Sequence, residues 1–162
     1  MRLFAALAAV GVLGAAWFGW SWWQAGHGDA QRFALTRDEV LRQGEQRLVV
    51  LNTVDRRDPV EVQRSWQSVA TGRLLDQLTR DREAHVRDIG AARTATAVTV
   101  LGAAVTSLDV HSGQAGLMAV LEVGVTPEGG PTTAKRTRFD VDLTRSGDQW
   151  LLSSVRVVGY GG

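Results

Sequence analysis

Cysteine is absent from this chain of 162 residues. Disulfide bonds, zinc sites built on thiolates and catalysis by a thiol are therefore excluded. The chain also lacks an excess of either charge, because 18 basic and 17 acidic side chains leave a net charge of +1. A domain without a basic excess can neutralise few phosphates, so we expect no nucleic-acid partner.

Local signatures of catalysis, cofactor binding and metal binding are missing as well. The sequence has no Gly-x-Ser-x-Gly turn, no phosphate-binding loop and no dinucleotide fingerprint. Its three histidines, His27, His85 and His111, stand in an expected linker, helix and turn at spacings that fit no ligand motif. We therefore predict a non-enzymatic protein with no catalytic residue, no cofactor and no metal ligand.

Charged side chains are also absent from Leu3 to Trp23. As a helix this segment would span about 31 Å, close to the roughly 30 Å hydrocarbon core of a bilayer. Arg2 precedes it, which favours a cytoplasmic N-terminus and places the rest of the chain across the membrane. The expected interfacial aromatic side chains crowd its far end: Trp17, Phe18, Trp20, Trp22 and Trp23.

A cleaved signal peptide is the alternative interpretation of this segment. Cleavage after Ala16 would leave Trp17 at the new terminus with more apolar chain behind it. We favour an uncleaved single-pass anchor in the cell membrane, in contact with the lipid bilayer. Both interpretations export residues 30–162.

The remaining chain is expected to form one domain. We place the anchor at residues 1–25, a juxtamembrane linker at 26–35, the domain at 36–158 and a glycine-rich tail at 159–162. Thr36 and Glu39 have the spacing of a capping box, which predicts a helix start at Thr36. Asp58 followed by Pro59 predicts a second helix start, and Gly90 is the expected end of the helical half.

From Thr94 onward, threonine, valine and alanine alternate as in β-strands. Turn signals at 111–113, 127–131 and 146–148 separate four expected strands, and Gly102 marks a bulge or bend in the first of them. Phe139, Val141 and Leu143 are expected on the core face of the third strand. Helices followed by an antiparallel meander predict an α+β domain with helices on one face of a curved sheet.

Several segments of this helix–helix–meander resemble the Mce-associated membrane proteins, a branch of the nuclear transport factor 2-like superfamily. The matching segments are Leu51–Asp55, Ala70–Leu75, Ala103–Leu108 and Gly147–Val155. The resemblance implies a cone-shaped domain and an accessory role in Mce-type lipid-import machinery at the cell envelope. Related single-anchor proteins serve as scaffolds in conjugation and type IV secretion.

Enzymes of that superfamily place an acid and a tyrosine or histidine inside the cone. Asp55 and Asp140 are the candidate acids, but Asp140 falls on the polar face of its strand and the only tyrosine, Tyr160, lies in the tail. Asp55 could equally cap the turn that follows it. A cavity used for a lipid or small molecule would be lined by residues such as Leu51, Asp55, Trp66, Phe139 and Trp150.

Three functions remain open at this point. The leading one is a non-enzymatic assembly subunit that binds an envelope transporter or a second copy of itself, and the alternatives are a lipid or small-molecule binding module and an enzyme. Met118 and Val120 face away from the expected core, on a strand face where solvent would favour polar residues. We therefore name these two side chains as the candidate partner surface.

Overall fold

The computed structural model describes residue 17 and residues 30–158. The chain divides into two compact units, residues 1–36 and 37–162. None of the helices among the described residues is both long and apolar enough to cross a membrane. Apart from Trp17, which is helical and 78% exposed, the expected anchor with Leu3, Trp20, Trp22 and Trp23 lies outside the described residues, as do His27 and Tyr160.

In the first unit, residues 30–36 are helical. The Thr36 hydroxyl donates a hydrogen bond to the Arg32 carbonyl at 2.9 Å, which is the contact of a threonine inside a helix rather than at its start. The predicted helix start at Thr36 is therefore wrong. Residues 32–35 contain no glycine or proline that would stop a helix, so the capping pattern alone did not fix the boundary.

The second unit begins with a helical segment at residues 37–52, called here the 37–52 segment. Val40 and Leu48 are fully buried, and Gly44 lies against the sheet so closely that an added Cβ would come within 2.8 Å of Leu117. The last helical turn is closed by Asn52, whose side-chain amide donates to the Leu48 carbonyl at 2.8 Å.

Three short helices follow: α2 (Pro59–Val69), α3 (Gly72–Arg80) and α4 (Arg82–Ala91). The predicted cap is confirmed, since the Asp58 carboxylate accepts a hydrogen bond from the Glu61 amide at 2.9 Å. The expected weak point near Gly72 is a complete break, because Ala70 is extended and forms a bridge with Leu152. Helix α4 ends one residue beyond the predicted stop at Gly90.

Four strands form one antiparallel sheet in the order β1–β2–β3–β4: β1 (Thr94–Asp109), β2 (Gln114–Pro127), β3 (Thr133–Ser146) and β4 (Gln149–Val158). Each of the three predicted turns contains a glycine with positive φ, namely Gly113, Gly129 and Gly147. The predicted irregularity at Gly102 is confirmed as a register shift in which Leu101 is the extra residue.

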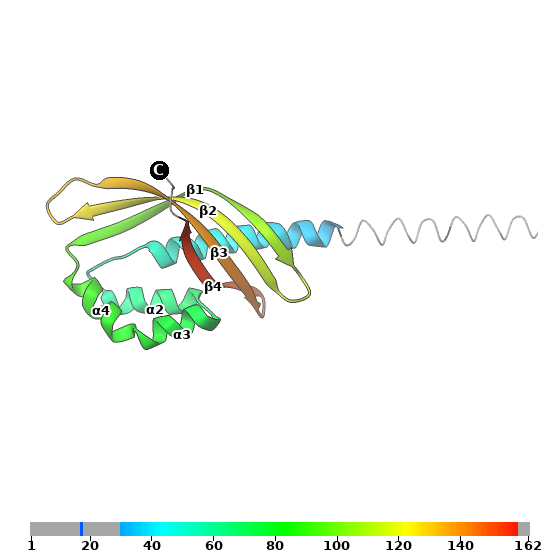
Figure 1. Cartoon of the computed structure of the whole chain (residues 1–162), viewed down its shortest axis with the longest axis horizontal. Coiled ribbons are helices and arrows are strands. Elements are labelled where there is room, and N and C mark those ends of the chain that lie inside the picture. The colour runs from blue at the N-terminus through cyan, green and yellow to red at the C-terminus, as the bar shows by residue number, and fades with distance from the viewer. Residues whose placement is uncertain (1–16, 18–29, 159–162) are drawn as a thin grey trace, which may run out of the picture. The chain divides into compact units, whose positions relative to one another are not determined.

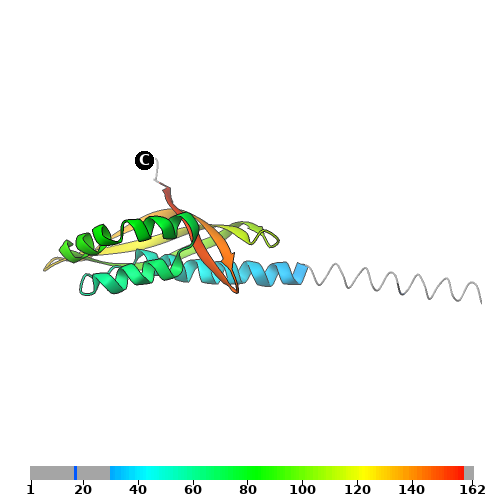
Figure 2. The ribbon, with the colours of Figure 1, turned by 90° about the horizontal axis from the view of Figure 1, so that it is seen from below.

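Helices α2, α3 and α4 lie on one side of the curved sheet (Figure 1). Seen from below, the end of the β3–β4 hairpin crosses in front of the 37–52 segment (Figure 2). The sheet face toward the helices is apolar and is called the inner face; the opposite face is called the outer face. Alternation along β2 and β3 places the expected residues on the inner face, where they are buried: Ala115, Leu117, Ala119, Leu121, Phe139, Val141 and Leu143. Trp150 and Leu152 of β4 complete this core.

Candidate functional site: the outer face of the sheet

Met118 and Val120 lie on the outer face of β2, as the alternation predicts. Met118 is 38% exposed, and Val120 is partly buried. On the β1 side Met118 lies opposite Ala104, whose side chain is a single methyl group, and Val120 lies opposite Gly102, which has no side chain. We call these four residues the Met118 patch. Its exposure is a fact of the structure, while its use by a partner stays a prediction.

Charged side chains border the Met118 patch on the β3 side. Met118 lies opposite Asp140, and Arg156 of β4 forms ion pairs with both Asp140 at 2.8 Å and Asp142 at 3.3 Å. The hydrogen bond that Arg156 donates to Asp140, followed by the charge of Asp142, raises the pKa of Arg156 above its ordinary value. The Arg156 guanidinium is therefore shared between two carboxylates.

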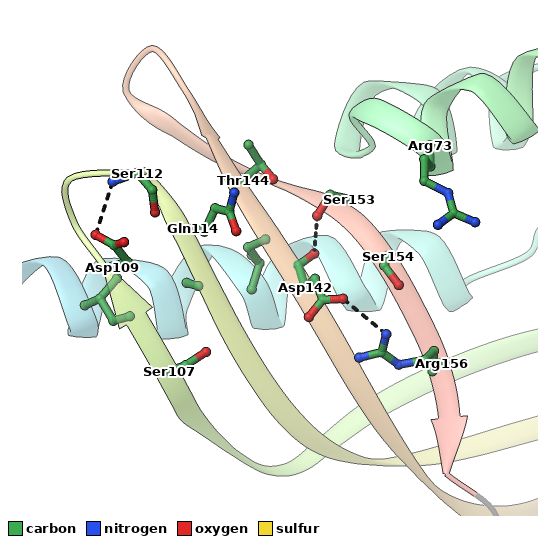
Figure 3. A pocket seen from close by; sticks show the side chains of 13 residues that line it. Arg73, Ser107, Asp109, Ser112, Gln114, Asp142, Thr144, Ser153, Ser154 and Arg156 are labelled. Carbon is green, nitrogen blue, oxygen red and sulfur yellow. Dashed lines mark hydrogen bonds and ion pairs between the residues drawn. The ribbon is translucent and has the colours of Figure 1, made fainter.

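A polar hollow of about 680 Å³ lies on the same face, toward the β1–β2 turn. Figure 3 shows side chains from all four strands around it, with Arg73 extending from the start of α3 on the far side of β4. Serine and threonine hydroxyls, an amide, two carboxylates and two guanidinium groups line it: Arg73, Ser107, Asp109, Ser112, Gln114, Asp142, Thr144, Ser153, Ser154 and Arg156.

Asp109 organises the turn at one end of the hollow. Its carboxylate accepts hydrogen bonds from the backbone amides of His111 at 2.9 Å and Ser112 at 3.1 Å. The Ser112 side chain, followed by these amides, lowers the pKa of Asp109 below its ordinary value. Among the residues that the structure describes around the hollow there is no histidine. The hollow therefore offers groups that can form hydrogen bonds, but neither a serine–histidine pair nor an acid–histidine pair of the kind used in catalysis.

Sequence reasoning missed this hollow. Its members on β1 and β3 sit at every second position, so the polar alternation was visible there, but the register that brings Asp109, Gln114 and Thr144 side by side was not. Arg73 was missed for a different reason. It comes from α3, and nothing in the sequence near residue 73 indicates that this helix starts beside β4.

The residues expected to line a cone cavity are placed in three different environments. Phe139 and Trp150 are 5% and 3% exposed and fill the core. Leu51 packs against that core and is partly buried. Trp66 is partly buried and contacts His85 edge to face, with ring centroids 5.8 Å apart. Asp55 is exposed, lines two surface hollows and accepts a hydrogen bond from the Arg57 amide at 3.0 Å.

The other candidate groups are placed as follows. Asp55 caps its turn as the alternative interpretation expected, and Asp140 is held in the ion pair with Arg156 on the outer face. His111 is exposed in the β1–β2 turn. Within residues 30–158 no three histidine or acidic side chains gather in a geometry that could hold a metal ion.

No protein-family model and no curated protein sequence matches this chain. Solved structures do match it in fold. An IcmL-like type IV secretion system protein from Legionella pneumophila has a TM-score of 0.61 at 8% identity, over 75% of this chain and 91% of that one. The periplasmic domain of DotI has a TM-score of 0.60 at 13% identity, over 74% and 92%.

A third match is CagV from Helicobacter pylori, described as a VirB8 homolog of a type IV secretion system, with a TM-score of 0.58 at 7% identity over 75% of this chain and 97% of that one. Identities this low show the fold alone. They do not show the expected Mce-associated branch. The fold is an α+β domain of the nuclear transport factor 2-like type, shared with subunits of type IV secretion systems.

Proposed function

We propose that this protein is a membrane-anchored, non-enzymatic assembly subunit of a type IV secretion or conjugation complex, and that it binds a protein partner through the Met118 patch. The observation that carries the proposal is an exposed apolar side chain, Met118, on a sheet whose other face is a packed core. The fold shared with secretion-system proteins, some of them described as periplasmic domains, favours this over a lipid-import role.

The patch has the properties of an interface centre. Methionine is common at protein–protein contacts because its flexible side chain adapts to a partner, and it is bordered here by small residues that allow close approach. The neighbouring Arg156, Asp140 and Asp142 are already paired with one another, so a partner need not supply a counter-charge to them.

The test is a double substitution, Met118→Glu with Val120→Glu, in the full chain. Two carboxylates in an apolar contact cost several kcal/mol, whereas at a solvent-exposed position they cost little. We expect the variant to keep its circular dichroism spectrum and to lose both self-association in sedimentation experiments and co-purification of partner subunits.

A matched control adds the same two charges at the other end of the same face. Ala97→Glu with Ala134→Glu does this, because both positions are exposed and lie on either side of Gly124 in one cross-strand row. The control should retain the contacts of the parent. If the Met118 and Val120 variant folds and retains them as well, the patch is not the interface.

The topology part of the proposal has its own test. Protease added to intact spheroplasts should digest residues 30–162 and leave an anchored N-terminal fragment. Protection of the domain from the protease would show that the orientation is reversed.

A further inference from the structure

The two edge strands of the sheet, β1 and β4, differ in how well they are protected from pairing with another strand. An open strand edge invites addition of a further strand, and proteins usually interrupt it with bulges or cover it. Strand β1 has both devices. Thr96 exchanges backbone hydrogen bonds with Val54 at 3.1 and 3.2 Å, and register shifts at Leu101 and Thr106 break the strand into short pieces.

Strand β4 is covered only at its beginning. The Trp150 amide donates to the Gln43 side chain at 2.8 Å, and the Leu152 carbonyl accepts from the Thr71 amide at 2.8 Å. These two contacts show that the backbone groups of Trp150 and Leu152 point away from β3. From Ser153 to Val158, no segment within the described part of the chain pairs with this outer edge.

The register shows which backbone groups of the open part face outward. Leu152 lies opposite Leu143, so Leu143 points toward β2, and alternation along β3 makes Val141 point toward β2 as well. Val155 lies opposite Val141, because Ser153 is an extra residue in β4. The amides and carbonyls of Val155 and, two residues on, Val157 therefore face the open edge.

This stretch of β4 carries none of the usual protective residues. It contains no proline or lysine, and its single charge, Arg156, is held by two carboxylates on the outer face. Val157 is 64% exposed and Val158 is 38% exposed. An apolar, unblocked edge of this kind is a template for strand addition.

Helix α3 forms the second wall of a groove beside this edge. The groove has a volume of about 570 Å³ and is lined on the β4 side by residues 153–156. On the α3 side the lining includes Arg73, Asp76, Gln77 and Arg80, which share one helix face at spacings of three and four residues. Neither Arg73 nor Arg80 forms a hydrogen bond or ion pair with any described residue, so this wall carries guanidinium groups without a bound carboxylate.

We propose that an extended, acidic segment of another protein binds here as a fifth strand, pairing with the backbone of Val155 and Val157 and placing a carboxylate on Arg73. Backbone hydrogen bonds along an edge provide affinity, and side chains that meet the flanking wall provide specificity. Arginine suits this role because its planar guanidinium binds a carboxylate through two parallel hydrogen bonds. The site lies apart from the Met118 patch and does not depend on it.

The probe is a labelled synthetic peptide of about eight residues, the length of an ordinary strand, in which valine and threonine alternate around one central glutamate. Its binding to the full chain in detergent is followed by fluorescence polarisation. Hydrogen exchange then reports the location, because peptide addition should slow exchange at the amides of Val155 and Val157. A second peptide with glutamine in place of glutamate measures the charge contribution.

Two substitutions separate the backbone and charge contributions. Val157→Pro removes an outward amide without touching the ladder to β3, and we expect it to weaken binding at least tenfold, while Val157→Ala keeps the amide and most of the affinity. Arg73→Gln should weaken the glutamate peptide about tenfold and make the two peptides equivalent. Arg87→Gln, on the exposed surface of α4, is the matched control and should bind like the parent.

The outcomes separate this proposal from that for the Met118 patch. The variant with glutamate at positions 118 and 120 should still bind the peptide, since the groove is elsewhere. The proposal is wrong if the parent binds neither peptide, or if Val157→Pro binds as tightly as Val157→Ala. A parent that dimerises through this edge, and becomes monomeric in Val157→Pro, would show that the occupant is a second copy instead.

Discussion

Replacing Gln43 by methionine should destabilise the domain although methionine fits a buried helical position well. Gln43 is 6% exposed in the 37–52 segment, and its side-chain oxygen accepts the Trp150 amide at 2.8 Å. Its side-chain nitrogen donates to the Glu39 carboxylate and, at 3.4 Å, to the Asp148 carbonyl. The amide group thus joins the helix to the β3–β4 turn and to the first residues of β4.

The expected loss in the free energy of unfolding follows from the Trp150 amide, which loses its hydrogen-bond acceptor in the variant. Without an acceptor the Trp150 amide is buried and unpaired, which costs about 1–3 kcal/mol. Burial of the methionine side chain in place of the amide returns less than about 1 kcal/mol. We therefore expect a net loss of about 1–2 kcal/mol in the free energy of unfolding, or a fall in Tm of about 4–10 °C for a domain of this size.

The pH dependence of this effect provides a second measurement. The hydrogen bond from Gln43, followed by that from Arg42, lowers the pKa of Glu39 below its ordinary value. A carboxyl with a lowered pKa in the folded state contributes stability above its unfolded pKa of about 4.3 and loses it as the pH falls through the folded value. The difference between parent and Gln43→Met should therefore narrow below about pH 4.

Chemical denaturation followed by circular dichroism, repeated across this pH range, measures both effects. Gln46→Met is the control, because Gln46 is exposed on the same helix and should change stability by no more than about 0.5 kcal/mol. Equal midpoints for the two variants at neutral pH would refute the reasoning, since they would mean that the Trp150 amide finds another acceptor at no cost.

Three further substitutions test the fold. Phe139→Ala should lower the free energy of unfolding by about 3–5 kcal/mol in urea denaturation, and a loss below about 1 kcal/mol would place this side chain outside the core. Asp58→Ala should cost about 1 kcal/mol through the lost cap of α2, and rescue by asparagine but not by leucine would identify capping as the cause. Gly113→Ala should lower the Tm, because φ is +64° and the new Cβ would lie 3.1 Å from Cβ of Arg145; an unchanged Tm would show that the turn relaxes freely.

The sequence predicted those parts of the fold that depend on local patterns. The inner faces of β2 and β3 follow from strict alternation, and the start of α2 follows from an aspartate before a proline. Each pattern repeats within a few residues and is reinforced by burial of its apolar members. The predicted helix start at Thr36 was wrong for a local reason as well. A capping residue begins a helix only where the preceding residues do not continue it, and residues 30–35 contain no glycine or proline to stop the helix.

The parts that the sequence did not predict depend on neighbours far away in the chain. The break between α2 and α3 is fixed by the bridge from Ala70 to Leu152, and the pairing of Arg156 with Asp140 and Asp142 depends on the extra residue Ser153. A shift of one residue in that register would move Arg156 to the other face of the sheet. Local periodicity gives the face of a strand but not its offset from the next strand.

The extra residue in β4 also explains how one strand can serve two surfaces. Before Ser153, the outward backbone groups of β4 belong to Trp150 and Leu152 and are occupied by the domain's own side chain and loop. After Ser153, the outward backbone groups are those of Val155 and Val157. The Arg156 side chain lies on the outer face, where it forms an ion pair with Asp140 beside Met118. The open edge therefore presents the backbone of Val155 and Val157, whereas the Met118 patch presents side chains of β1 and β2. The two proposals can therefore be tested in one protein, because Val157→Pro changes no side chain of the Met118 patch, and glutamate at positions 118 and 120 changes no backbone group of β4.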